Sequence, residues 1–179
     1  MFVIYNFILF LILLVSPLFV AIRIFLGKED QFRFKEKYGF LAKNSKSYET
    51  IWMHGASVGE ILSIIPIVKR FEEDQKIKRI LITSSTTSSS HVLSKFKFKK
   101  TVHQFYPFDI NVLTKHFINH WKPKLAIFVD SEIWPNMFNN LHKNNIPIIL
   151  LNARITKKSF DRWKLFPNFS KKIFEKITL

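Results

Sequence analysis

The chain begins with a long apolar segment. Residues 1–22 include no charged side chain, and Asn6, Ser16 and Pro17 are the interruptions of the apolar run. A helix needs about 20 apolar residues to cross the hydrocarbon core of a bilayer. The pattern therefore predicts a single transmembrane helix, and we assign residues 1–26 to a membrane anchor.

The residues behind this anchor predict its orientation. Residues 27–49 form a basic juxtamembrane segment, and the cations that follow the apolar run are Arg23, Lys28, Arg33, Lys35 and Lys37. By the positive-inside rule, this flank and the domain after it lie in the cytoplasm. A cleaved signal peptide needs a basic region before the run and a small-residue cleavage site after it, and the sequence has neither. A buried or monotopic helix kinked at Pro17 is the remaining alternative.

Beyond the polar stretch from Ala42 to Glu49, short apolar runs alternate with amphipathic ones. The predicted strands are Thr50–His54, Lys78–Ser84, Val102–Tyr106, Leu125–Val129 and Pro147–Leu151. The predicted helices are Ile61–Glu73, Ser88–Phe98, Ile110–Trp121, Asn136–Asn144 and Ser159–Lys176, the last broken or kinked at Pro167. Strands alternating with helices are typical of βαβ units around a parallel sheet, and nearly continuous apolar strands fit a sheet covered on both faces. Residues 50–179 are therefore expected to form one α/β domain with a Rossmann-like parallel sheet.

Composition narrows the possible partners. The chain has 179 residues, a formal net charge of +15 and no cysteine. The length suits one domain plus an anchor, and the missing cysteines exclude disulfides and cysteine-based zinc sites. The charge favours polyanions, namely nucleic acid, anionic lipid head groups or phosphorylated substrates.

The loops after the strands are the expected place for chemistry, because ligands of such sheets bind beyond the carboxyl ends of the strands. The loop after the first strand carries Gly55 and Gly59, whose backbones permit a tight turn and a close approach to a ligand. Glu60 then falls in the first turn of the next helix, where the helix dipole favours the ionised carboxylate. Glu60 is a candidate general base, and a capping carboxylate without chemistry is the alternative.

Two later loops carry further charged residues. Asp130 and Glu132 follow the fourth predicted strand and place two carboxylates at the same edge of the sheet. Their alternative role is to cap the helix that begins near Pro135. Arg154 follows the fifth strand and could bind a phosphate with its planar guanidinium, or make a surface salt bridge.

Several motifs occur in a fixed order along this α/β frame. They are FKEKYGF (34–40), HGASVGE (54–60), TSSTTSS (83–89), YPFD (106–109), DSEIWPN (130–136) and IPIILLNARIT (146–156). Each motif alone is weak, but the ordered set is specific. The chain resembles, from the apolar segment to its last residue, the N-terminal half of the 3-deoxy-D-manno-octulosonic acid (Kdo) transferase family of Gram-negative bacteria.

The resemblance implies an inverting glycosyltransferase of the GT-B arrangement, which moves Kdo from CMP-Kdo to the lipid A precursor at the inner membrane during lipopolysaccharide biosynthesis. It implies that Glu60 is the catalytic base and that Glu132 is the second essential carboxylate. It places Ser57, Gly59, Asp130 and Arg154 among the substrate-binding residues. It implies no metal and no cofactor, and the basic surface fits a phosphorylated acceptor in an anionic membrane.

The sequence departs from the family in two respects. The loop at residues 84–90 has neither the proline nor the glycine usual there, and Asp130-Ser131 replaces Glu-Thr. The family sequence also continues into a second domain that supplies most of the CMP-sugar contacts. The chain is therefore expected to be inactive without that donor domain. Three accounts of it remain open: a truncated product, one piece of a split enzyme with a separate C-terminal half, or a non-catalytic remnant that binds anionic lipid or lipid A precursor.

Two rival readings are weaker. Nucleic-acid binding suits the charge, but the aromatic residues sit in apolar runs and no recognition module is evident, so no nucleic-acid partner is expected. His116 and His120 are four residues apart and could share a helix face, but no third ligand is evident, so a solvated face is favoured over a metal site. The phosphate-binding GxxxxGK[ST] pattern does not occur.

Overall fold

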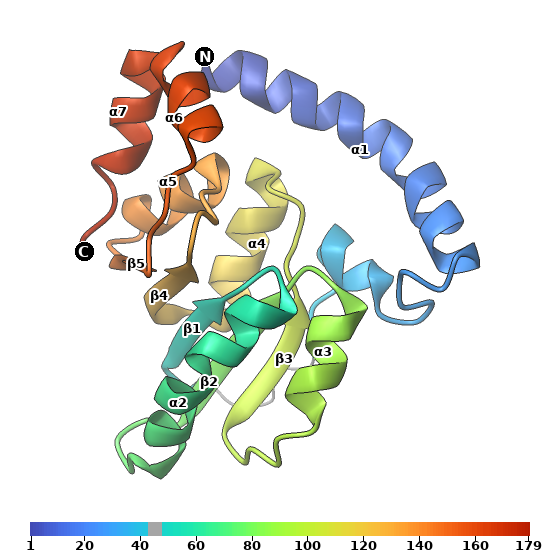
Figure 1. Cartoon of the computed structure of the whole chain (residues 1–179), viewed down its shortest axis with the longest axis vertical. Coiled ribbons are helices and arrows are strands. Elements are labelled where there is room, and N and C mark those ends of the chain that lie inside the picture. Colours follow the sequence, from blue (N-terminus) through green and yellow to red (C-terminus); the bar gives the residue numbers. More distant parts are fainter. Residues whose placement is uncertain (43–47) are drawn as a thin grey trace.

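A five-stranded parallel sheet forms the centre of the protein (Figure 1). The structure is a computed structural model that describes residues 1–42 and 48–179, so part of the predicted polar stretch lies outside the described residues. The strands are β1 (Thr50–His54), β2 (Arg79–Ser84), β3 (Thr101–Phe105), β4 (Pro123–Val129) and β5 (Ile148–Leu151). Their order is β3-β2-β1-β4-β5. The predicted α/β class and all five predicted strands are confirmed, with ends shifted by at most two residues.

Helices cover both faces of this sheet. The helices of the described residues are α1 (Phe2–Phe25), η1 (Phe34–Tyr38, a 3₁₀ helix), α2 (Val58–Glu73), α3 (Thr87–Ser94), α4 (Asn111–Trp121), α5 (Pro135–Lys143), α6 (Lys157–Lys164) and α7 (Pro167–Phe174). Side chains of α2 and α3 pack with Met53 and Ile82 in one buried cluster. Side chains of α4, α5 and α7 pack with Trp52 and Phe128 in the other. Because neighbouring residues of a strand face opposite sides, Trp52 and Met53 each enter a different core.

Local sequence explains where several helices begin. Ser57 caps α2 by accepting a hydrogen bond from the backbone N–H of Glu60, so the helix starts at Val58, three residues before the predicted start. Proline occupies the first turn of α5 and of α7, where it needs no helical N–H partner. Pro167 thus divides the predicted Ser159–Lys176 helix into α6 and α7.

Helix α1 is continuous despite an internal proline. Pro17 has no N–H for the carbonyl of Leu13, but the Ser16 hydroxyl donates to that carbonyl at 2.8 Å. The helix curves over the carboxyl end of the sheet, and its last turn leads into η1 (Figure 1). Among the described residues α1 is the one helix long and apolar enough to cross a membrane, as judged by length and composition.

Both outer edges of the sheet are covered by segments distant in sequence. Beside β3, the Glu36 carboxylate accepts from the Phe105 N–H at 2.7 Å, and the Arg33 guanidinium donates to the His103 carbonyl at 2.9 Å. Beside β5, Thr178 donates its N–H to the Ile148 carbonyl at 2.8 Å, and the Leu150 N–H donates to Leu179 at 2.9 Å.

Candidate functional site

The candidate site lies where the strand order of the sheet reverses. Strands β1 and β4 are neighbours at its centre, and the chain leaves them toward opposite faces. In sheets of this order ligands bind in the crevice between the two loops that follow such strands. Here these loops carry Glu60 after β1 and Glu132 after β4.

Glu60 is held by the turn that precedes its own helix. Its Oε2 accepts a hydrogen bond from the Ala56 N–H at 2.8 Å, and its Oε1 accepts from the Ser57 hydroxyl at 2.6 Å. With the Ser57 cap on the Glu60 N–H, this is a variant of the capping box in which the carboxylate bonds the N–H of Ala56, the residue before the cap. The capping role that the sequence left open is therefore present. These hydrogen bonds leave the carboxylate with unused acceptor capacity, because its two oxygens offer about four acceptor positions. The side chain is also half-exposed.

Gly55 makes this turn possible. A Cβ at position 55 would lie 3.0 Å from the Cβ of Glu60 and 3.3 Å from its backbone carbon. The polar loop after β2 packs against the same turn, since the Ser85 N–H and the Ser89 hydroxyl both donate to the Ala56 carbonyl at 3.4 Å. The loop that lacks the family's proline and glycine therefore contacts the turn that holds Glu60.

Glu132 is held by residues from two strand ends. Its Oε2 lies 2.9 Å from Trp134 Nε1, which donates to it, and 3.3 Å from His54 Nε2. His54 is buried at the end of β1, and its Nδ1 lies 2.9 Å from the hydroxyl of Thr83 on β2. The Glu132 side chain keeps 21% of its surface exposed, so it can reach a ligand.

Asp109 has a role that sequence analysis missed. It follows β3 at the end of the YPFD motif and is buried at the start of α5. Its carboxylate accepts from the N–H groups of Asn136 at 2.9 Å and Met137 at 2.8 Å, and from the Tyr5 hydroxyl at 2.7 Å. Burial raises the pKa of Asp109 to about 6, and these hydrogen bonds oppose the rise.

This finding corrects the capping alternative for the acidic loop after β4. The N-terminus of α5 is capped across space by Asp109, whereas Glu132 bonds Trp134 and His54. The local signal was ambiguous because acidic residues close before a helix are the usual caps. The YPFD motif was noticed, but nothing in its spacing points to a helix that begins 26 residues later.

Arg154 lies at the exposed rim of the site. Its Nε is 3.7 Å from Asp130 Oδ1, and its side chain is 72% exposed. Asp130 has a left-handed backbone with φ of 56° and also accepts from the Asn152 side chain at 2.7 Å. The Ser131 hydroxyl donates to the Arg154 carbonyl and joins the loops after β4 and β5. The exposed ion pair is worth little stability, so the guanidinium can exchange it for an anionic ligand.

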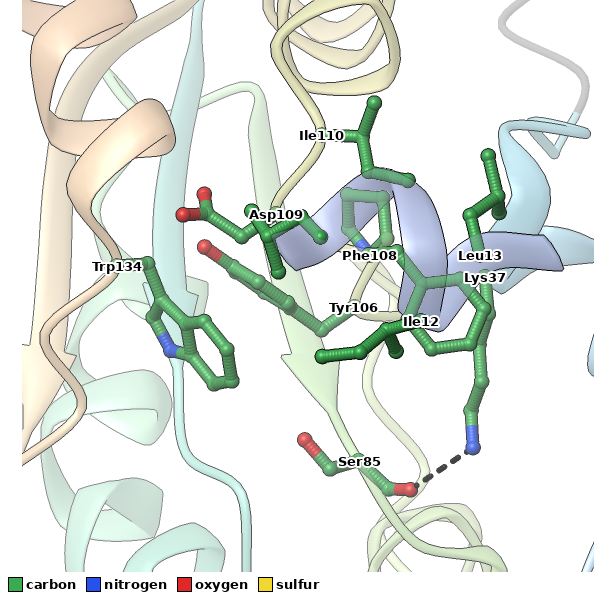
Figure 2. Close-up of a pocket in the computed structure, with 11 residues that line it drawn as sticks. Ile12, Leu13, Lys37, Ser85, Tyr106, Phe108, Asp109, Ile110 and Trp134 are labelled. Atoms are coloured by element: carbon green, nitrogen blue, oxygen red, sulfur yellow. Dashed lines mark hydrogen bonds between the residues drawn. The ribbon is translucent and has the colours of Figure 1, made fainter. Parts of the chain in front are cut away.

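An apolar cavity of about 270 Å³ lies between α1 and this edge of the sheet. Figure 2 shows Ile12 and Leu13 of α1 on one side, Tyr106 and Trp134 on the other, and Lys37 bonded to the Ser85 carbonyl. The buried Tyr106 hydroxyl finds no hydrogen-bond partner within the described residues. Burial, first of all, raises the pKa of Tyr106 well above its usual value, so the hydroxyl stays neutral.

The residues predicted from the sequence fall into three local groups in the loops at the carboxyl edge of the sheet. Ser57, Gly59 and Glu60 lie at the start of α2, and Glu132 reaches the end of β1 through His54. Asp130 and Arg154 form a separate, exposed pair on the rim. His120 Nε2 donates a hydrogen bond to the Ala42 carbonyl oxygen at 2.8 Å. No group of three possible metal ligands occurs among residues 1–42 and 48–179.

The chain is similar in sequence to known proteins of one family. Residues 32–179 match the family described as 3-deoxy-D-manno-octulosonic-acid transferase (kdotransferase). A transferase of that name from Rickettsia bellii is 39% identical over 160 residues, which cover 89% of this chain and 38% of the relative. The Haemophilus influenzae protein of the same name is 33% identical over 73% of this chain and 31% of its own length. A probable mitochondrial one from Arabidopsis thaliana is 34% identical over 76% of this chain and 31% of its own length.

Among solved structures, a UDP-N-acetylglucosamine 2-epimerase superposes with a TM-score of 0.48 at 13% identity, covering 72% of this chain and 38% of that one. This likeness is too distant to bear on function. The chain spans about a third of the length of the relatives named above. The match over residues 32–179 shows that the chain belongs to the 3-deoxy-D-manno-octulosonic acid transferase family, of which it represents the N-terminal region.

Proposed function

We propose that this chain supplies the acceptor-binding half of an inverting transferase that moves Kdo from CMP-Kdo to a lipid A precursor. The observation that carries the proposal is the position of Glu60 at the centre of the sheet's carboxyl edge. Its carboxylate is fixed by Ala56 and Ser57, stays half-exposed, and retains capacity to accept a further proton.

In this proposal Glu60 acts as the general base. It takes the proton of an acceptor sugar hydroxyl while that oxygen attacks the anomeric carbon of Kdo from the face opposite CMP. The new carbon–oxygen bond forms as the bond to the phosphate oxygen breaks, and CMP leaves as an anion with the bonding electron pair. Inversion needs one such displacement and one base, which matches a single carboxylate at this position.

Glu132 is the second carboxylate of the proposed site. Its two hydrogen bonds converge on Oε2, which leaves the other oxygen able to accept from a substrate hydroxyl. We propose that Ser57 and Gly59, both exposed at the start of α2, line the acceptor pocket. Arg154 and Asp130 lie on the rim, where the guanidinium is placed to bind a phosphate group of the substrate.

An acylated acceptor also needs apolar surface near the base. The cavity beneath α1 borders Ser85, which contacts the Glu60 turn, and Trp134, which bonds Glu132. We therefore propose that acyl groups of the acceptor approach the site from the side of α1. This arrangement favours a membrane lipid over a soluble sugar as the acceptor.

The same reasoning proposes a location. The apolar helix α1 and the net charge of +15 support attachment to the anionic inner membrane of a bacterium, with the domain on the cytoplasmic side. A single-pass span is the arrangement that length and flanking charge predict for α1. The contacts between α1 and the domain favour a helix that lies in the plane of the membrane surface.

The test is a Kdo-transfer assay with purified chain, CMP-Kdo and lipid A precursor, run with and without the separately expressed C-terminal region of a relative. We expect Glu60→Gln to lower turnover by about 10²- to 10⁴-fold, the usual contribution of a general base. The fold should survive, because Gln also satisfies a capping box. Glu73→Gln at the exposed far end of α2 is the matched control.

The outcomes separate the transferase from the alternative, a non-catalytic lipid-binding remnant. Turnover that needs the C-terminal region and disappears with Glu60→Gln supports the proposal. Retained turnover in Glu60→Gln overturns the assignment of the base. Binding of lipid A precursor without turnover in either mixture would favour the remnant.

A further inference from the structure

One face of α1 is turned toward the domain along most of its length. The buried or half-buried positions include Phe2, Asn6, Leu9, Leu13, Ser16 and Val20. They recur every three or four residues, which places them in one stripe along the helix. The remaining faces carry exposed apolar side chains, among them Ile4, Leu11 and Leu18.

The uncharged polar residues Tyr5, Asn6 and Ser16 of α1 fall on this inner stripe, and each bonds a residue outside the helix. Tyr5 donates to Asp109 at 2.7 Å, the Asn6 side chain accepts from Asn136 at 2.8 Å, and Ser16 bonds the Tyr38 hydroxyl at 2.9 Å. These contacts run from Tyr5 in the first turn to Ser16 in the fourth. Helix α1 has 24 residues and is therefore about 36 Å long, so the domain lies alongside it rather than at one end.

The α6–α7 hairpin stands beside the first turn of α1 (Figure 1). The ring of Phe169 on α7 is 5.1 Å from that of Phe2, and it stacks on Trp163 of α6 at 6.2 Å. Phe160, Leu165 and Phe166 of this hairpin are exposed. The cations of α6 are Lys157, Lys158, Arg162 and Lys164.

A membrane-spanning orientation conflicts with these contacts. If α1 crossed the bilayer as it is docked here, the domain residues bonded to it would enter the hydrocarbon, including the carboxylate of Asp109. The α6 cations beside its first turn would also lie at the opposite side from Arg23 and Lys28. Burying ionisable groups in hydrocarbon is costly. Because cations flank both ends of α1, the positive-inside rule does not assign either end to the cytoplasm.

We propose that α1 lies in the plane of an anionic bilayer surface, its polar stripe on the domain, its apolar faces in the acyl-chain boundary and α6 beside it as a second contact. Interfacial helices usually need a polar face for water, and here the domain takes that place. The four cations and exposed aromatic side chain of α6 suit anionic head groups. The proposal does not depend on transferase activity.

The first experiment measures depth in the membrane. Because the chain has no native cysteine, single-cysteine variants carry one label each. Ile4→Cys, Leu11→Cys and Leu18→Cys lie on one outward face, seven residues apart, and are labelled with an environment-sensitive fluorophore. The full chain is reconstituted in vesicles of phosphatidylcholine and phosphatidylglycerol that contain lipids with quenchers at known depths.

An in-plane helix places all three labels at a similar depth, about 5–10 Å below the head groups. A spanning helix places the Leu11 label deepest, because Ile4 and Leu18 are about 21 Å apart along the axis. Leu13→Cys on the inner stripe is the control. It is shielded from lipid quenchers if α1 stays docked, and it is quenched like Leu11→Cys if α1 leaves the domain. A single deep maximum at Leu11, or strong quenching at Leu13, would overturn the proposal.

The second experiment tests α6. The double variant Lys157→Gln and Lys158→Gln should bind phosphatidylglycerol vesicles roughly tenfold or more weakly than the unmodified chain, with a smaller change in neutral vesicles. Lys76→Gln with Lys97→Gln removes the same charge from exposed positions at the opposite end of the sheet. Equal weakening in both double variants would mean that net charge alone acts. The proposed membrane contact of α6 would be overturned if the α6 double variant bound vesicles as tightly as the unmodified chain. If an added C-terminal region then shielded the exposed apolar residues of α6 from solvent, that region would be the partner of this surface.

Discussion

His54 Nε2 lies 3.3 Å from Glu132 Oε2, although 78 residues separate the two in the sequence. The contact joins the ends of the two central strands, β1 and β4. His54 in turn contacts Thr83 at the end of β2, and its ring packs 4.1 Å from that of Tyr106. Glu132 is therefore placed by three strand ends, and its position depends on the register of the sheet.

We expect Glu132→Gln to separate activity from stability. Gln keeps an oxygen that can accept from Trp134, so the free energy of unfolding should change by less than about 1 kcal/mol. Kdo transfer in the two-part assay should fall by about 10²-fold, because the charge at the site is lost. Glu49→Gln, at an exposed residue paired with Lys124, is the control and should be neutral. Normal transfer by Glu132→Gln would remove this residue from the proposed machinery.

Two glycines of the first loop should respond in opposite ways. Gly55→Ala brings a Cβ within 3.3 Å of the backbone carbon of Glu60, so overpacking should destabilise the fold by about 1–3 kcal/mol. Gly59→Ala meets nothing closer than Ser57 Oγ at 4.0 Å and adds helix propensity, so stability should hold or rise. Urea unfolding in mild detergent measures both. A Gly59→Ala variant that is stable but has a raised KM for the acceptor would support a pocket at the start of α2, whereas equal destabilisation by both changes would contradict the steric argument.

Asp109 should be among the costliest polar side chains to remove. Asp109→Ala leaves two backbone N–H groups at the start of α5 and the Tyr5 hydroxyl without their acceptor, which we expect to cost about 3 kcal/mol or more. Asp109→Asn retains one acceptor oxygen, so its loss of unfolding free energy should lie between zero and that of Asp109→Ala. Asp74→Ala, at a loop residue that accepts from the Lys76 N–H, should cost less than about 1 kcal/mol. Similar losses at positions 74 and 109 would show that the buried cap is not special.

His103 should make the protein less stable in acid. Burial, followed by the charge of Arg33, lowers the pKa of His103 from 6.5 to about 3. Because Arg33 can only donate, His103 Nδ1 accepts at 3.0 Å and the ring is neutral. The unfolded chain therefore binds a proton between about pH 6.5 and 3 that the folded chain does not. The free energy of unfolding should therefore decrease as the pH is lowered through that window. This residue contributes up to about 1.4 kcal/mol of the decrease per pH unit.

Asp109 acts with the opposite sign over a narrower range. Its pKa is raised from 3.8 to about 6, so its contribution to stability is greatest below pH 4 and is lost as the pH rises through 6. The measurement is the urea midpoint from pH 7.5 to 4 for the unmodified chain and for His103→Gln. A shallower acid slope in His103→Gln is expected. Identical slopes, or an NMR titration of His103 near pH 6.5, would contradict a buried neutral ring.

Much of the fold could be predicted because its signals are local. The run at Leu125–Val129 is continuous and apolar because β4 is covered on both faces. Pro167 separates α6 from α7, because it suits the first turn of a helix better than the interior. The position of Glu60 in the first turn of a helix was also predictable, because the S-x-x-E spacing that signals it spans only four residues. These features depend on neighbours in the sequence.

The unpredicted features depend on contacts between distant residues. Nothing near Asp109 indicates that it caps α5, and nothing near Glu132 indicates His54 as its partner. One signal was available in the first segment, where Tyr5, Asn6 and Ser16 share a face of an otherwise apolar run. The mean hydropathy of the segment does not reveal that face. The spacing of its polar residues, in contrast, predicts a helix packed against the domain.

The covered edges of the sheet have a consequence for the nascent chain. Exposed β-edges pair readily with strands of other molecules. Here β3 is protected by Glu36 of η1, which lies 69 residues before its partner Phe105. Strand β5 is protected by Thr178 and Leu179, about 30 residues after it. Until both segments have folded back, the sheet offers two open edges for aggregation. The yield of refolding should therefore fall steeply with protein concentration, even though the finished sheet has both edges closed.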